Sequence, residues 1–184
     1  MVTCSFTLDG KLVFTSSPGS VDRSCITPYL HVMSEVSPSL ARTAFILTAA
    51  GALPFIALAV AMGVLDAPTN STAGLWLQTY AAVILSFLGG IRWGLAIGAP
   101  SGASGTLALS VLPALAGWIM LPFAIILMPG PVWYLGFAAL FAIQLIWDRA
   151  SGAVPAWFKT IRLQVSLVVI ASLAAAWAVQ TYLF

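Results

Sequence analysis

The chain has 184 residues, of which 61% are apolar and only 7% are charged, against about 25% charged residues in an average soluble domain. So few charges cannot cover the surface of a water-soluble domain, and so many apolar residues exclude a disordered chain. The net charge is +2 and the basic residues form no cluster, so no nucleic-acid partner is expected. The composition predicts an integral membrane protein that lies in a lipid bilayer.

Residues 1–41 differ from the rest of the chain because they are polar and rich in turn-forming residues. They hold both cysteines and the single histidine, which are too few ligands to close a zinc site, so no metal or cofactor is expected. We expect a polar, flexible segment at 1–41 and a membrane domain at 42–184. Met33 allows two interpretations: translation starts there and residues 1–32 are not made, or a flexible tail begins at Met1.

The membrane domain contains five apolar segments of about the length that a transmembrane helix needs, roughly 20 residues. They lie at about 43–65, 75–97, 106–128, 131–147 and 163–183. Turn-forming residues separate them, and none has a polar face that would shield it from water. The fold class predicted is therefore an all-α integral membrane protein with about five transmembrane helices. Internal prolines at Pro54, Pro113 and Pro122 predict kinks in the first and third helices.

The basic residues of the membrane domain predict its orientation. In a chain with five spans, all of them fall on the side of the N-terminus: Arg42, Arg92, Arg149, Lys159 and Arg162. The opposite side carries only one charge, Asp66. The excess of Lys and Arg in cytoplasmic segments then predicts a cytoplasmic N-terminus and a C-terminus outside.

Small residues recur every four positions along the second predicted span. They are Ala82, Ser86, Gly90, Gly94 and Gly98. Such a stripe lets two helix backbones approach closely, and this packing drives association inside a membrane. Packing within the monomer is one interpretation, with the alanine-rich fifth span as the candidate neighbour. The others are packing against a second copy of the chain or against another membrane protein.

Arg92 is the unusual charge, because it lies about 8 Å inside the predicted end of the second span. An arginine at the centre of a bilayer costs about 2.5–3.5 kcal/mol, and less near the interface. Asp148 is the acidic residue nearest this level, and Gln144 lies one helical turn before it. We predict a contact between Arg92 and Asp148. The alternative is an Arg92 side chain that extends to the lipid headgroups.

Three segments carry a resemblance to a known family: YAAVILSFLGGIRWG at 80–94, QLIWDR at 144–149 and PAWFKTIR at 155–162. They resemble the domain of unknown function 3429 (DUF3429) family, whose eukaryotic relatives are called transmembrane protein 69. The resemblance covers about residues 42–183. It implies a small multi-span protein of bacterial inner membranes, or of mitochondrial membranes in eukaryotes, and it implies no established activity.

The candidate structural or functional residues are Arg92, Asp148, Gln144, Ser86, Gly89, Gly90, Trp93, Gly94, Arg149, Trp157 and Arg162. They contain no catalytic combination of His, Cys and carboxylate side chains, so no enzyme activity is expected. We favour a structural or assembly partner of other membrane proteins. The alternative is a small transporter or channel, although the predicted spans carry few ionisable groups for a proton relay.

Overall fold

The computed structural model describes residues 4–6, 12–14, 38–98, 104–152, 154 and 156–183. It divides into two compact units, Met1–Arg42 and Thr43–Phe184. In the first unit, strand β1 (Cys4–Phe6) pairs antiparallel with β2 (Leu12–Phe14), which sequence analysis did not predict. Met33, and with it the question of the start, lies outside the described residues.

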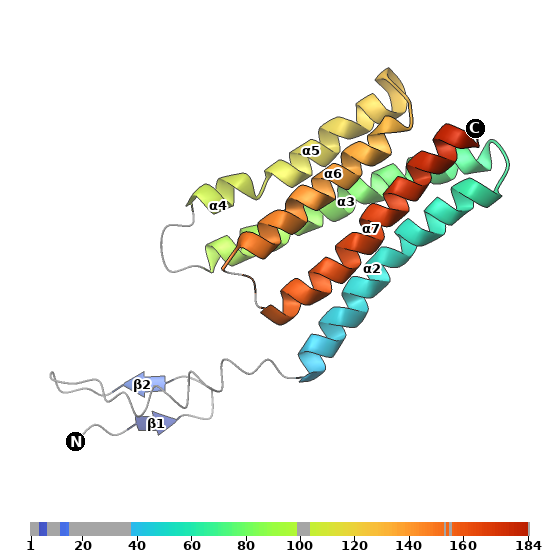
Figure 1. The fold of residues 1–184 in the computed structure, drawn as a ribbon. Coiled ribbons are helices and arrows are strands. Elements are labelled where there is room, and N and C mark those ends of the chain that lie inside the picture. Colours follow the sequence, from blue (N-terminus) through green and yellow to red (C-terminus); the bar gives the residue numbers. More distant parts are fainter. Residues whose placement is uncertain are drawn as a thin grey trace. The chain divides into compact units, whose positions relative to one another are not determined.

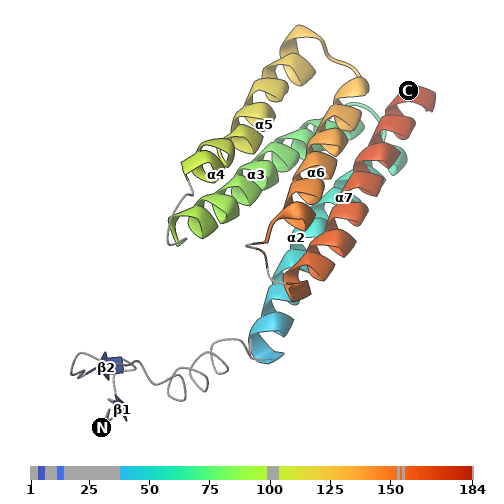
Figure 2. The same cartoon turned by 60° about the vertical axis from the view of Figure 1, so that its left-hand side comes forward.

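The second unit is helical. Figure 1 shows its long helices side by side as a bundle, and Figure 2 shows the same arrangement from another side. The elements are α2 (Pro38–Val64), α3 (Thr69–Ile97), α4 (Ser104–Leu109), α5 (Leu112–Pro122), the π-helix η1 (Phe123–Leu127), α6 (Val132–Ala150) and α7 (Ala156–Tyr182). Helix α3 packs against α4, α5 and α6, and α7 packs against α6.

Four helical segments are long and apolar enough to cross a membrane: Ser39–Val64, Thr69–Ile97, Ser104–Leu127 and Trp157–Tyr182. This confirms the predicted class, an all-α membrane protein with several spans. The fifth predicted span, α6, has 19 residues and is about 28 Å long, but polar and charged side chains near its C-terminus make it less apolar. That α6 crosses the membrane stays a prediction.

Two helices begin earlier than the sequence predicted. Helix α3 starts at Thr69, so that Asn70, which was expected in a loop, lies in its first turn. Helix α7 starts at Ala156, and Arg162 therefore lies within a helix and not at the end of a loop. Both extensions place polar side chains inside the helical unit, where they can reach neighbouring helices.

The third predicted span is broken into three pieces, and two prolines mark the breaks. Helix α4 ends at Leu109, and α5 restarts at Leu112 with Pro113 in its first turn, where the missing N–H costs no helical bond. Pro122 ends α5, and η1 follows it. The predicted disruption at these prolines is confirmed. Helix α2, in contrast, continues as one helix through Pro54.

The core lies between α2, α3, α6 and α7. Its largest fully buried side chains are Phe55, Phe137, Leu77, Leu85 and Leu173. Phe55 packs edge-on against Phe141 with 5.6 Å between ring centroids, and Tyr80 donates a hydrogen bond of 2.9 Å to the carbonyl oxygen of Gly51. These contacts join α2 to α6 and to α3.

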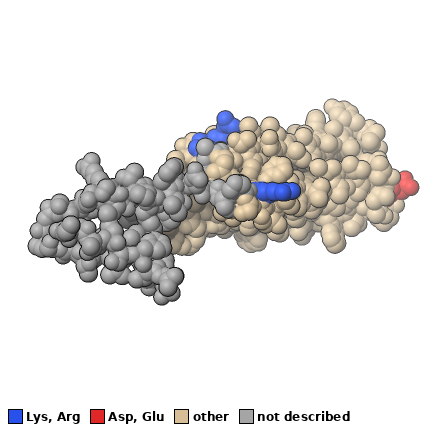
Figure 3. All heavy atoms as spheres, turned by 90° about the horizontal axis from the view of Figure 1, so that it is seen from below, with Lys and Arg blue, Asp and Glu red and all other residues tan. Residues whose placement is uncertain are grey.

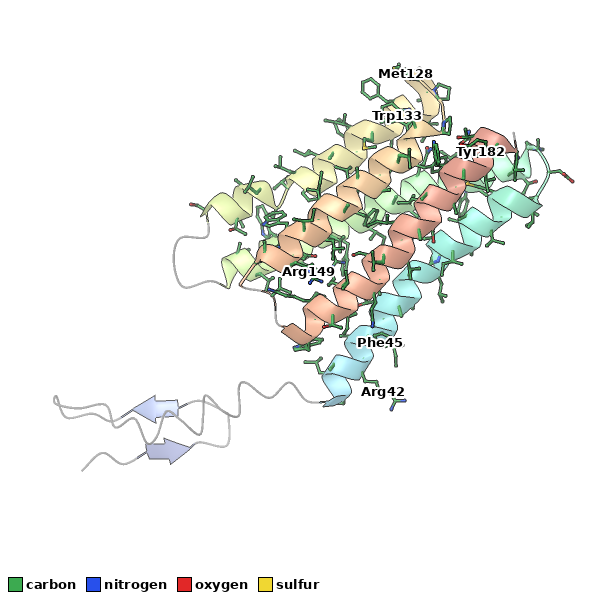
Figure 4. All side chains as sticks on the ribbon, viewed as in Figure 1. Arg42, Phe45, Met128, Trp133, Arg149 and Tyr182 are labelled. Carbon is green, nitrogen blue, oxygen red and sulfur yellow. The ribbon has the colours of Figure 1, made fainter. Side chains whose placement is uncertain are left out.

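The outer surface of the helical unit is largely apolar. Large side chains such as Val64, Trp76 and Ile146 are more than half exposed, and Figure 4 shows side chains projecting from all the helices. A soluble protein does not expose apolar surface on this scale, so this face contacts the lipid bilayer. On the face seen in Figure 3, Lys and Arg side chains lie toward one end of the unit, whereas an acidic side chain lies at the opposite tip.

Candidate functional site

Three helices bring their charged side chains together at one place in the bundle. Arg92 of α3 donates a hydrogen bond from Nε to Oδ1 of Asp148 on α6, at 3.0 Å. Arg162 of α7 donates from Nε and Nη2 to Oδ2 of the same carboxylate, at 2.9 and 2.7 Å. The predicted Arg92–Asp148 contact is present. We call these three residues the Arg–Asp–Arg cluster.

The cluster is buried. Arg92 is 2% exposed, and Asp148 and Arg162 are each 6% exposed. Arg92 therefore does not extend to the surface, which rules out the alternative that its side chain reaches the lipid headgroups. In this setting, each charge depends on its neighbours because removing one partner from a buried ion pair typically costs 3–5 kcal/mol.

Two further residues of α6 complete the surroundings of the cluster. Gln144 is 2% exposed and donates from Nε2 to Oδ1 of Asp148 at 3.4 Å, a long hydrogen bond from one turn away on the same helix. The guanidinium carbon of Arg92 lies 4.3 Å from the ring centroid of Trp147, in a cation–π contact. The Trp147 ring thus stabilises the Arg92 guanidinium, which forms its hydrogen bond to the carboxylate through Nε.

The cluster holds two guanidinium groups and one carboxylate. Nη2 of Arg92 lies 2.8 Å from Oδ1 of Asp148, yet it is buried and its angles do not give a hydrogen bond. Arg162 makes two hydrogen bonds to the other carboxylate oxygen, Oδ2. One oxygen of Asp148 therefore binds Arg92 of α3, and the other binds Arg162 of α7. The arrangement therefore joins three helices through one carboxylate.

Sequence reasoning missed that Arg162 belongs to this cluster. It placed Arg162 beside the fourth loop because the fifth apolar segment begins near residue 163. The structure extends α7 back to Ala156, which carries Arg162 one full turn and more into the helix. The apolar residues just before 163 could have indicated that the helix starts earlier. The charges at Lys159 and Arg162, which are typical of a loop, concealed this extension.

Part of the small-residue stripe packs inside the monomer, against α5. An added Cβ at Gly117 of α5 would lie 3.1 Å from Cα of Ala82, and one at Gly89 would collide with the carbonyl oxygen of Ser110. Close approach at these positions depends on the absence of a side chain. The candidate neighbour was α7, but the part of the stripe at Ala82 packs against Gly117 of α5.

The rest of the stripe faces outward. Ser86, Gly90, Gly94 and Gly98 are exposed. A Cβ added at Gly90 or at Gly94 would have nothing within 4 Å. The exposed residues Ser86, Gly90 and Gly94 define what we call the open face of α3. Trp93, at 43% exposure, borders this face.

The other candidate residues lie outside the cluster. Arg149 is exposed, and its carbonyl oxygen accepts a 3.0 Å hydrogen bond from Nζ of Lys159. Figure 4 labels Arg149 near the C-terminal end of α6. The indole Nε1 of Trp157 is buried and has no hydrogen-bond partner among the described residues. Neither residue contributes to the buried ion pairs.

A second polar group lies at the other end of the bundle. Asn70 and Gln78 of α3 and Tyr134 of α6 are all buried, and the Tyr134 hydroxyl interacts with the Gln78 side chain. Sequence reasoning missed this group because it placed Asn70 in the loop between the first two predicted spans, outside the helices. Within the described part of the chain, no three His, Cys, Asp or Glu side chains gather as a metal site.

The sequence matches a known family over most of its length. The model of "Protein of unknown function (DUF3429)" matches residues 40–178, which include the whole Arg–Asp–Arg cluster and the open face. Transmembrane protein 69 of Xenopus tropicalis is 33% identical over 142 residues, which cover 72% of this chain and 52% of the relative. The chain thus spans about half the length of the curated relative that it matches. No solved structure matches. On this evidence, the chain belongs to the DUF3429 family of proteins of unknown function.

Proposed function

We propose that the protein is a structural or assembly partner of other membrane proteins, and that it binds a transmembrane helix of such a partner on the open face of α3. We place it in a bacterial inner membrane, or in a mitochondrial membrane if the chain is eukaryotic. The observation that carries the proposal is the state of the small-residue stripe, of which one part is covered by α5 and the other is left open.

The two parts of the stripe provide a comparison within one helix. At Ala82 of the stripe, and at Gly89 beside it, the lack of bulk is used, because Gly117 of α5 and the backbone of Ser110 lie directly against these two positions. At Gly90 and Gly94, the same lack of bulk meets open space. A glycine in the middle of a helix costs about 0.8–1.0 kcal/mol relative to alanine. A partner backbone that packs against the open face would account for two such residues there.

The interior of the bundle favours assembly over the transport alternative. The Arg–Asp–Arg cluster and the second polar group are separated by about 21 Å along α3, from Gln78 to Arg92. Between them lie buried apolar residues of α3 and α6, among them Leu85 and Phe137, each 0% exposed. On α3 and α6, this apolar layer separates the two polar groups. The charges instead join α3, α6 and α7.

The test is to purify the protein in mild detergent from its native membranes, as wild type and as the double variant Gly90→Leu, Gly94→Leu. Ala57→Leu is the matched control, since it adds the same bulk at an exposed position of α2. We expect all three proteins to fold, because the added side chains meet open space. A defined membrane protein should co-purify with wild type and with the control, and it should be lost from the double variant.

Two results would argue against the proposal. A wild-type protein that purifies as a lone monomer has no stable partner. A partner that remains bound to the double variant does not use the open face of α3. Co-expression of two differently tagged copies adds one distinction: recovery of both tags together would identify the partner as a second copy of this chain.

A further inference from the structure

A cavity of about 320 Å³ opens at the end of the bundle opposite to the Arg–Asp–Arg cluster. Residues of α2, α3, α6 and α7 line it, together with η1 and the segment that follows η1. Figure 4 labels Met128, Trp133 and Tyr182 at this end of the helical unit. The volume lies near the lower limit of small-molecule sites in proteins, about 300–1,000 Å³.

The polar side chains of this cavity converge from three helices. Asn70, Gln78 and Tyr134 line it, and each is at least nine-tenths buried. Gln180 of α7 also lines it, and its Oε1 atom is buried without a hydrogen-bond partner among the described residues. A buried acceptor without a hydrogen-bond partner destabilises the folded state. A ligand that donates a hydrogen bond to Gln180 would remove that destabilisation.

The uncharged lining of the cavity and its apolar side chains restrict the ligand further. No lining residue carries a charge, so an ionised ligand would have no counter-charge in this low-dielectric site. The lining combines amide and hydroxyl groups with apolar side chains, including Met62, Leu75 and Ile125. The cavity thus suits an uncharged molecule with a polar head and an apolar body.

The π-helix forms one wall of the cavity. Met128 donates its backbone N–H to the carbonyl oxygen of Phe123 at 2.9 Å, five residues back, which is the bond of a π-helix. Ala124 and Ile125 of η1 line the cavity, and Trp133 fixes the end of η1 by donating from Nε1 to the carbonyl oxygen of Met128 at 2.7 Å. Single turns of π-helix occur frequently at functional sites.

We propose that this cavity binds the head of an uncharged amphiphile that carries at least one hydroxyl group, with Gln180 accepting a hydrogen bond from it. Two sources share this chemistry: a hydroquinone with an alkyl chain, and the glycerol head of a diacylglycerol. In both, a hydroxyl group donates a hydrogen bond to Gln180, and the apolar body lies against Met62 and Ile125. This site is independent of the open face of α3.

The test uses the purified full-length protein in detergent and calorimetric titration with two probes, decylubiquinol and dioctanoylglycerol. We expect one probe to bind saturably with one molecule per chain. Dioctanoyl phosphatidic acid, which has a similar apolar body and an ionised head, should not bind. Which of the first two probes binds distinguishes the hydroquinone from the glycerol head.

Two variants locate the binding. Gln180→Met keeps the size of the side chain and removes its acceptor, so it should weaken binding by about tenfold, the effect of one hydrogen bond. Gly130→Leu adds bulk at a lining position where an added Cβ meets nothing within 4 Å, so it should weaken binding. The controls are Thr181→Val, next to Gln180 but on the exposed side, and Gly152→Leu, at the other end of the unit.

The proposal would be overturned by either of two results. Neither uncharged probe binds to the wild-type protein, or a probe binds equally well to wild type and to Gly130→Leu. Thermal unfolding of each variant without probe shows whether it is folded. If Gln180→Met does not fold, Gly130→Leu still decides the question, because it changes a loop residue outside the helical core.

Discussion

At the scale of single residues, Gly89 and Gly90 show that neighbouring glycines in one helix have different roles. Gly89 is buried against the backbone of Ser110, whereas Gly90 is exposed and faces open space. Both belong to the segment that carries the family resemblance. The sequence alone could not separate them, because the direction in which each one points depends on which helix lies next to α3.

This difference predicts opposite effects for the same substitution. We expect Gly89→Ala to lower the free energy of unfolding by about 1–3 kcal/mol, since the new methyl group meets a backbone oxygen that cannot move aside. Gly90→Ala should be neutral, or stabilising by up to about 1 kcal/mol, because alanine favours the helix. Thermal unfolding in detergent measures both. Equal effects would contradict the packing of α3 on the α4–α5 junction.

The Arg–Asp–Arg cluster predicts a strong dependence on its single acid. Asp148→Asn removes the carboxylate and leaves two buried guanidinium groups unpaired, so we expect a loss of about 3–5 kcal/mol of stability. Arg92→Met should cost less, because Asp148 keeps its two bonds to Arg162. Asp66→Asn, at an exposed loop position, is the control and should have almost no effect.

Chemical or thermal unfolding of these three variants gives the order of their effects. If Asp148→Asn lowers the stability no more than Asp66→Asn, the buried cluster does not hold α3, α6 and α7 together. If Arg92→Met is the most damaging, the carboxylate depends mainly on α3 and not on α7.

At the scale of the elements, the third apolar segment departs most from its prediction. Its composition gave one span at 106–128, whereas the structure has α4, α5 and η1. The prolines at 113 and 122 were the available signal, and they marked the breaks correctly. They could not predict a π-helix, because a proline marks where a regular helix is interrupted and not which backbone bonds follow.

The candidate site could be predicted from the sequence only in part. Arg92 and Asp148 could be paired from the sequence because charges are so scarce in the membrane domain. Arg162 could not be added, since its position depends on where α7 begins. Asn70 and Gln180 looked like ordinary residues near helix ends, and only the packing of six segments around one cavity reveals that they converge.

The broken third segment predicts uneven local stability. Pro122 lacks an N–H, and η1 has large exposed side chains at Ile126 and Leu127. We expect its amide hydrogens to exchange faster than those of α3 around Leu85, which is 0% exposed. Hydrogen–deuterium exchange with mass spectrometry, on the protein in detergent, measures both segments at once. Equal protection of η1 and α3 would contradict the assignment of η1 as a weak point.

At the scale of the whole molecule, the number of membrane crossings determines on which sides the two ends of the chain lie. Four helical segments meet the requirements of length and apolarity, and α6 with 19 residues is the fifth. Five crossings place the two ends of the chain on opposite sides, whereas four place them on the same side. The excess of Lys and Arg on one side supports five, with the N-terminus in the cytoplasm.

A reporter fused after Phe184 tests this topology in bacterial cells. Alkaline phosphatase at that position should be active, because it folds only outside the cytoplasm, and a cytoplasmic fluorescent reporter should be dark. The same two reporters fused after Gly98 provide the control, since this loop should lie in the cytoplasm. An inactive phosphatase after Phe184, with the control as expected, would mean that α6 does not cross the membrane.

The central claim is that another transmembrane helix packs on the open face of α3, and crosslinking in intact membranes tests it most directly. A photo-crosslinking amino acid at Trp93 borders this face, and one at Ile56, an exposed residue of α2, is the control. We expect irradiation to give one defined adduct with a membrane protein from position 93. The adduct should disappear when Gly90→Leu and Gly94→Leu are added, and it should be absent from position 56. Crosslinks to lipid alone from position 93, or an adduct unchanged by the two leucines, would contradict the account.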